Sequence, residues 1–483
     1  MLFNSLEFLL FFPVVMILYQ LLPRKHRWLL LLASSYLFYM AWKVEYVFLI
    51  LFSTGVDYWA ALRMVRTEEP RVRRRYLFLS IFANLGLLFA FKYMGFFNTS
   101  LNEAFAWAGL PWQFFVPNWL LPVGISFYTF QTMSYTIDVY KGKVKPERHF
   151  GYFALYVSFF PQLVAGPIER PGHLLPQLHR LASPTEKEFA SGIRLMLWGY
   201  FKKVVIADRI VMFTQPVFMD PENFGFWSVV PALFFLLIQV YADFSGYTDI
   251  AIGSARCMGV HLSENFNRPF TATSIRDFWA RWHITLTNWF RDYLFFSFSF
   301  TRKGKVQRWR IHLGLFLMLL LIGLWHGANW TFITFGAIHG VYLIVGNLIR
   351  PYGERMALRT GLSRRPLLRE YLGIARTMLL LMFSAFFFGR HSFAQSMTMM
   401  RQAVVMDGFK GSLLWLRGND SILSVLLVIF LFVAERKMAH QGGGAEILSR
   451  LSVGKRWLLY LAFFFFILIF GIFHKNEFIY FQF

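Results

Sequence analysis

Cysteine is almost absent from this sequence, which has one, Cys257, among 483 residues. A single cysteine excludes an intramolecular disulfide framework and a four-cysteine zinc site. Charge is also scarce: Asp, Glu, Lys and Arg make up 16% of the residues, whereas a soluble domain carries about 25%. No linker rich in Gly, Ser or Pro divides the chain. Disorder, a coiled coil and a soluble nucleic-acid-binding protein are therefore excluded as the main character of this protein.

Several chemical motifs are missing as well. The sequence contains neither a P-loop nor a dinucleotide fingerprint, and it has no G-x-S-x-G nucleophile elbow. No His, Cys, Asp and Glu residues have the short spacing of a zinc site. We therefore expect no metal and no tightly bound cofactor. Any nucleophile must belong to the substrate, or the chain is not an enzyme.

Apolar residues make up 57% of the sequence, and aromatic residues make up 20%. Apolar segments near the length of about 20 residues that crosses a bilayer recur from end to end. This pattern predicts an all-α polytopic membrane protein, with residues 1–483 as one integral membrane domain. The predicted spans are 5–23, 28–42, 46–62, 76–97, 114–136, 192–212, 227–243, 311–325, 329–348, 373–388, 421–434 and 456–473.

The net charge of +23 comes from Lys and Arg clusters between these spans. Basic loops face the cytoplasm. Residues 24–27, 63–75 and 141–148 carry such clusters, and the alternate loop 98–113 has neither Lys nor Arg. This alternation places the N-terminus outside and the basic loops in the cytoplasm.

Two stretches are too polar for helices that face lipid. Residues 159–180 contain four prolines, and residues 264–292 mix Arg, Asp, Asn and His with three tryptophans. Polar or irregular backbone persists at membrane depth only when protein buries it or when it lines an aqueous cavity. Both stretches predict re-entrant segments around a funnel; the alternative is an amphipathic cytoplasmic loop.

Ionisable residues inside a membrane span are costly and are candidates for function. His326 follows the apolar run 311–325, which would rise about 22 Å and so end within a hydrocarbon core of about 30 Å. A neutral histidine there can accept a proton from a hydroxyl or a thiol. The residues alone leave a helix-packing role for His326 equally open.

Two further histidines have similar settings. His339 lies between Ile338 and Gly340 in the next span, where packing is the favoured interpretation. His283 lies in the most polar stretch of the chain and can either orient a substrate or be structural. Asp243 and Asp249 are six residues apart and do not share a helical face, so we expect them to pair with nearby arginines.

At these positions the sequence resembles the membrane-bound O-acyltransferase (MBOAT) superfamily, and most closely its bacterial alginate O-acetylase branch. The matching text begins with Gly124-Ile125-Ser126-Phe127-Tyr128 and ends with the His339-Gly340 pair. The aromatic end Phe478–Phe483 also looks like that branch. The motifs between these limits are Ser158–Ile168, Asp243–Tyr247, Glu264–Phe270, Arg281–Leu286 and Leu324–Trp330.

The resemblance implies that His326 is the catalytic histidine of the family's Trp-His-Gly motif. It also implies that His283 occupies a second site position, which different branches fill with His, Asn or Asp. The implied fold is a bundle of about 11–13 transmembrane helices around a funnel. Its parts would be N-terminal spans in 1–113, the catalytic core in 114–348 and C-terminal spans in 349–483.

The implied activity is transfer of an acyl group, expected to be acetyl, from a cytoplasmic thioester to an exopolysaccharide such as alginate. Acetyl-CoA or an acyl carrier protein would be the donor, His326 the general base or a transient acyl carrier, and His283 the residue that polarises the thioester carbonyl. A periplasmic acetyltransferase and the exopolysaccharide machinery would be the partners. The resemblance also implies a bacterial inner membrane, so the N-terminus would lie in the periplasm. The alternatives are transfer of D-alanine or another acyl group to a different envelope polymer, and a transporter without chemistry.

One segment departs from the family pattern. Relatives follow the equivalent of Arg291–Leu294 with a Pro-Leu-Gly-Gly-type turn, whereas this chain continues with Phe295–Phe300. Loss of the glycine pair removes a tight turn. We still expect an acyltransferase. The departure gives less support for assigning the donor, acceptor and partner of alginate enzymes to this protein.

Overall fold

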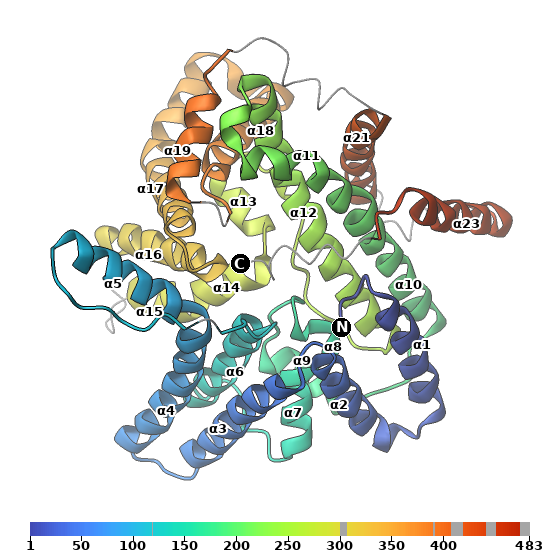
Figure 1. Ribbon diagram of the computed structural model, residues 1–483. Coiled ribbons are helices and arrows are strands. Elements are labelled where there is room, and N and C mark those ends of the chain that lie inside the picture. The colour runs from blue at the N-terminus through green and yellow to red at the C-terminus, as the bar shows by residue number, and fades with distance from the viewer. Residues whose placement is uncertain (118, 300–306, 390–391, 407–418, 441–450, 474–483) are drawn as a thin grey trace. The chain divides into compact units, whose positions relative to one another are not determined.

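The computed structural model describes residues 1–117, 119–299, 307–389, 392–406, 419–440 and 451–473 (Figure 1). Within these ranges every regular element is a helix, and no β-strand is present. The all-α fold class predicted from the sequence is confirmed. Phe300 and the aromatic end Phe478–Phe483 lie outside the described residues.

Six of the twelve predicted spans coincide with helical segments that are long and apolar enough to cross a membrane. The other six coincide with shorter or more polar helices, among them α1 (Leu6–Leu21) and α18 (Pro366–Ala385). One predicted span begins too early: the helix expected from residue 114 starts at Ile125, after Gly124 with its φ of 78°. Together these helices make a multi-pass membrane protein. The six apolar segments are Val44–Val65, Pro70–Trp107, Phe226–Cys257, Arg308–His326, Trp330–Arg359 and Val453–Phe470.

The chain forms two compact units, and the division of the sequence at residues 113 and 348 stays a prediction. The first unit comprises residues 1–196 and 250–264. Besides α1 it contains α2 (Arg24–Met40), α3 (Val47–Val65), α4 (Pro70–Leu88), α5 (Met94–Trp107), α6 (Ile125–Tyr140), α7 (Phe150–Ser158), α8 (Phe160–Leu163), α9 (Pro171–Leu178) and most of α10 (Glu186–Tyr200).

A buried polar cluster joins three helices of the first unit, α3, α4 and α6, which lie side by side (Figure 1). The Asp57 carboxylate accepts hydrogen bonds from the Ser80 hydroxyl at 2.6 Å and from the Asn84 amide at 2.9 Å. Thr132 of α6 donates to the Asn84 side-chain oxygen at 3.2 Å. The cluster shows how this unit buries a carboxylate: several donors surround it on neighbouring helices.

The second unit comprises residues 197–249 and 265–483. Its long helices are α12 (Phe226–Cys257, through Asp249), α16 (Arg308–His326), α17 (Trp330–Arg359) and α18. Shorter helices are α11 (Asp208–Met219), α13 (Ile275–Arg281), α14 (Ile284–Phe290), α15 (Phe296–Ser299), α19 (Phe393–Gln402), α21 (Asn419–His440) and α23 (Val453–Phe470).

Both polar stretches form short, largely buried helices. Residues 153–169, around α8, are buried throughout, and α13 and α14 bury Phe278, Trp279 and Trp289. This burial is what polar backbone requires at membrane depth, and it disfavours an exposed loop. Where the family resemblance leads us to expect a glycine turn, this chain continues as the π-helix η6 (Arg291–Phe295) into α15.

Glycines bring α16 and α17 unusually close together. A Cβ at Gly323 would clash with the Phe332 carbonyl oxygen, and a Cβ at Gly336 would clash with the Leu319 carbonyl oxygen. Small residues permit such backbone contact between membrane helices, where dispersion rather than water exclusion drives association. The α16–α17 hairpin is therefore a tightly packed pair, and it carries both His326 and His339.

Candidate active site

His283 lies in a sharp turn between α13 and α14. The turn requires a left-handed backbone at His283, with φ 42° and ψ 54°. Two backbone hydrogen bonds hold it against the preceding segment: Asn267 N–H donates to the Arg281 carbonyl and Ile284 N–H donates to the Asn265 carbonyl, both at 2.9 Å. The imidazole is fully buried. The fold therefore fixes the position of the His283 ring.

The Asn265 side chain reaches the same turn. Its Oδ1 atom lies 3.0 Å from His283 Nδ1 and 2.9 Å from the Thr285 hydroxyl. Rings surround the other faces of His283, with Phe244 at 4.7 Å and Trp325 at 5.5 Å between centroids. Asn265 is thus a polar contact of a histidine that also packs against aromatic side chains.

His326 is the last residue of α16, at the turn into α17. Asn329 caps α17 by accepting a hydrogen bond from Thr331 N–H at 3.2 Å. The His326 ring is 2% exposed and lies 5.2 Å from the Trp325 ring and 5.4 Å from the Phe388 ring. Because Trp325 contacts both His283 and His326, the structure brings the two predicted site histidines to one aromatic side chain.

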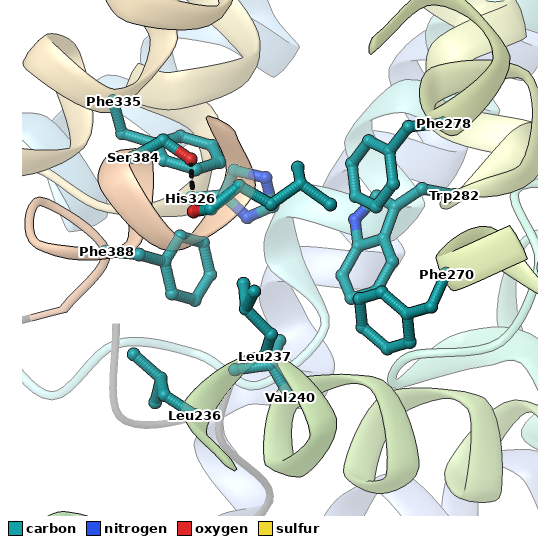
Figure 2. A pocket seen from close by; sticks show the side chains of 11 residues that line it. Leu236, Leu237, Val240, Phe270, Phe278, Trp282, His326, Phe335, Ser384 and Phe388 are labelled. Carbon is teal, nitrogen blue, oxygen red and sulfur yellow. Dashed lines mark hydrogen bonds between the residues drawn. The ribbon is translucent and has the colours of Figure 1, made fainter. Parts of the chain in front are cut away.

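A pocket opens beside His326 (Figure 2). Its wall is apolar except for His326, the Ser384 hydroxyl and the Trp282 indole. Such a surface suits an acyl group and keeps water away from a reactive ester. The lining residues are Leu236, Leu237 and Val240 of α12, Phe270, Phe278, Trp282, His326, Phe335 of α17, Leu381 and Ser384 of α18, and Phe388.

His339, by contrast, is hydrogen-bonded at both ring nitrogens. Trp279 Nε1–H donates to His339 Nδ1 at 3.2 Å, and His339 Nε2 lies 3.0 Å from the Ser384 hydroxyl. Ser384 in turn donates to the Leu381 carbonyl at 2.8 Å, the dashed line in Figure 2. These contacts join α13, α17 and α18, so the interactions of His339 are those of a residue that packs helices together.

The carboxylates of α12 pair with lysines, whereas the sequence favoured arginines. Lys203 Nζ lies 2.7 Å from Asp243 and 2.8 Å from Asp208, and Lys202 Nζ lies 2.7 Å from Asp249. Both lysines belong to the π-helix η3 (Phe201–Ala207). The π-helix directs two consecutive lysines toward α12, which the spacing of the acidic residues alone could not indicate.

Sequence reasoning also missed Asn265, Ser384 and Phe388. Asn265 stands inside a motif quoted for the resemblance, but an asparagine in a loop gives no periodic signal. Ser384 and Phe388 lie in an apolar run without polar spacing. Among the described residues no group of three His, Cys, Asp or Glu could hold a metal ion. The chemistry available here is proton transfer by histidine beside an apolar pocket.

Comparison with known proteins places this arrangement in a family. The sequence profile of the membrane-bound O-acyltransferase family, MBOAT, matches residues 147–389, which include His283 and His326. Proteins named probable alginate O-acetylase are similar to this chain. The one from Azotobacter vinelandii is 42% identical over 357 residues, covering 72% of this chain and 69% of the relative. The one from Pseudomonas aeruginosa is 42% identical over 352 residues, covering 71% and 66%.

A more distant relative is a peptidoglycan O-acetyltransferase from Helicobacter pylori, 35% identical over 66% of this chain and 63% of the relative. The chain thus spans about two thirds of the length of these relatives. The resemblance drawn from the motifs is confirmed. This chain belongs to the membrane-bound O-acyltransferase family and is an acyltransferase.

Proposed function

We propose that the protein takes an acetyl group from a cytoplasmic thioester and passes it across the inner membrane for O-acetylation of an exopolysaccharide such as alginate. The observation that carries the proposal is the placement of His326, in its Trp-His-Gly motif, in the wall of the apolar pocket. The names of the relatives support acetyl as the acyl group and a polymer as the final acceptor.

The chemistry follows from the setting of His326. Its imidazole takes the proton of the attacking hydroxyl while the hydroxyl oxygen bonds to the thioester carbon. The carbon–sulfur bond breaks, and the imidazolium returns the proton to the leaving thiolate. General-base catalysis contributes about 10²–10⁴-fold. The pocket holds the acyl group and excludes water, which would otherwise hydrolyse the thioester.

Donor, partner and orientation complete the proposal. Acetyl-CoA or an acyl carrier protein supplies the thioester at the cytoplasmic face, where the basic loops lie. A periplasmic acetyltransferase completes the transfer to the polymer. The N-terminus lies in the periplasm, as the positions of Lys and Arg indicate.

The test is mass spectrometry of the exported polymer from cells that carry wild type, His326→Ala or the matched control His312→Ala. His312 belongs to the same helix, α16, and does not line the pocket. We expect His326→Ala to abolish acetylation at normal protein level and His312→Ala to retain it. Normal acetylation by His326→Ala would refute the proposal.

The same spectra decide between acyl groups. A teichoic acid D-alanyltransferase from Bacillus subtilis is 30% identical over 48% of this chain, a lower identity and coverage than the O-acetyl relatives have. Alanyl esters on the polymer would show that the protein transfers D-alanine, and would refute acetyl transfer. If the purified protein moves a solute into vesicles and no polymer carries an acyl ester, both acyl-transfer hypotheses are refuted and the protein is a transporter.

A further inference from the structure

The contacts of Asn265 determine which nitrogen of His283 carries the proton. Asn265 Oδ1 faces the backbone N–H of Thr285 at 3.3 Å. A backbone N–H can only donate, so the Asn265 atom that faces it must be the oxygen and the amide cannot be turned over. The oxygen also accepts from the Thr285 hydroxyl at 2.9 Å. The orientation of the Asn265 side chain is therefore fixed by its neighbours.

An oxygen in this position only accepts hydrogen bonds, so His283 Nδ1, 3.0 Å away, must be the donor. A neutral imidazole carries one N–H. If that proton is on Nδ1, then Nε2 holds the lone pair and acts as an acceptor. Both residues are buried, Asn265 at 1% and His283 at 0% exposure, so water does not compete for the Asn265 oxygen.

His339 has the opposite arrangement in the same unit. Trp279 Nε1–H can only donate, so His339 Nδ1 must accept, and the proton lies on Nε2, which donates to Ser384. The two buried histidines therefore adopt different tautomers, each set by one neighbour of unambiguous chemistry. This difference supplies an internal reference for a measurement on His283.

We propose that Asn265 is a positioning residue, which holds His283 in the Nδ1–H tautomer and thereby leaves the lone pair of the ring on Nε2. This inference rests on the proposed function. It also changes the role expected for His283, because a neutral imidazole in this tautomer cannot donate from Nε2 to a thioester carbonyl. His283 accepts a hydrogen bond or proton instead.

The test is nitrogen NMR of the full-length protein, labelled with ¹⁵N-histidine and reconstituted in lipid nanodiscs. Protonated and unprotonated ring nitrogens resonate at well-separated shifts, and subtraction of the His283→Asn spectrum identifies the His283 signals. We expect Nδ1–H for His283 and Nε2–H for His339 in the wild type. An Nε2–H tautomer at His283 in the wild type would overturn the proposal, and this measurement requires no substrate.

Two substitutions separate positioning from packing. Asn265→Leu removes the acceptor, so His283 should lose its tautomer preference and polymer acetylation should fall at least about tenfold. Asn265→Asp keeps an acceptor oxygen and should retain the Nδ1–H tautomer and recover most of the acetylation. The His339 signals should stay unchanged in both variants.

Full acetylation by Asn265→Leu, or equal loss in both variants with the tautomer preserved, would overturn the positioning role. If Asn265→Leu also shifts the His339 signals, its fold is altered, and the wild type and Asn265→Asp decide the matter by themselves. Absence of acetylation in the wild type would instead refute the proposed function and leave the tautomer result standing.

Discussion

The turn at His326 and the middle of α17 at His339 belong to one helical hairpin. Both segments bury a histidine, but the surroundings of the two side chains differ. Aromatic rings surround both side chains: Phe388 lies 5.4 Å from His326, and Phe335 lies 4.4 Å from His339. His339 is hydrogen-bonded at both nitrogens to other helices, whereas His326 lines the apolar pocket. The two histidines thus share burial among aromatic rings and differ in that only His326 of the pair lines the pocket.

Exchange of His339 for alanine tests this comparison most directly. His339→Ala leaves the Trp279 N–H without its acceptor and opens a cavity, so we expect a loss of about 2–5 kcal/mol in unfolding free energy. His326→Ala should cost less stability, because a pocket already adjoins its ring, and should lose acyl transfer. Thermal unfolding in detergent and polymer acetylation at permissive temperature measure the two effects. The comparison fails if both variants lose stability equally.

The glycine contact between the two helices should affect both histidines. Gly336→Ala would push α17 away from the Leu319 carbonyl oxygen, at a cost of about 1–3 kcal/mol, and should lower acyl transfer as well. Gly346→Ala on the same helix is the control, because a Cβ there meets no atom within 4 Å. The control should be neutral or slightly stabilising. Equal melting temperatures for the two variants would contradict close packing of the hairpin.

Filling the pocket should affect only the His326 side of the comparison. Leu237 is partly exposed in the pocket wall (Figure 2), so Leu237→Phe adds volume to open space and should cost little stability. We expect at least about a tenfold loss of acyl transfer, because the acyl group and the ring compete for space. Leu237→Met preserves volume and should retain transfer. Unimpaired transfer by Leu237→Phe would exclude this pocket as the acyl site.

An exposed histidine of the first unit, His173, extends the comparison to a side chain that is not buried. The hydrogen bond from His173 to Glu169, at 2.6 Å, raises the pKa of His173 above its usual value of about 6.5. The resulting stability is fully present below pH 6.5 and is lost as the pH rises through the raised value. His173→Gln should therefore lower the melting temperature slightly at pH 6 and leave it unchanged well above neutrality. A difference independent of pH would show that packing, not charge, joins these residues.

The helices could be predicted from the sequence because they depend on interactions between residues that are close together in the chain. Apolar runs such as 311–325 predict helices because backbone groups must bond internally in lipid. His326 became a candidate because ionisable residues are rare beside apolar runs, and His283 because it lies in the most polar stretch of the chain. Asn265 and Ser384 could not be found, because their contacts join segments far apart in sequence. The lysine partners of Asp243 and Asp249 were missed because a π-helix changes which residues face α12.

The left-handed backbone at His283 has a consequence for how this position can vary. At φ 42° most side chains clash with the main chain, and Asn, Asp and His are the non-glycine residues that tolerate the conformation best. These are the three residue types that the family resemblance assigns to this position in its different branches. The left-handed conformation therefore restricts which residue types can occupy this position, whatever the substrate is. Within that small set of polar side chains, the chemistry of the reaction determines which one is suitable.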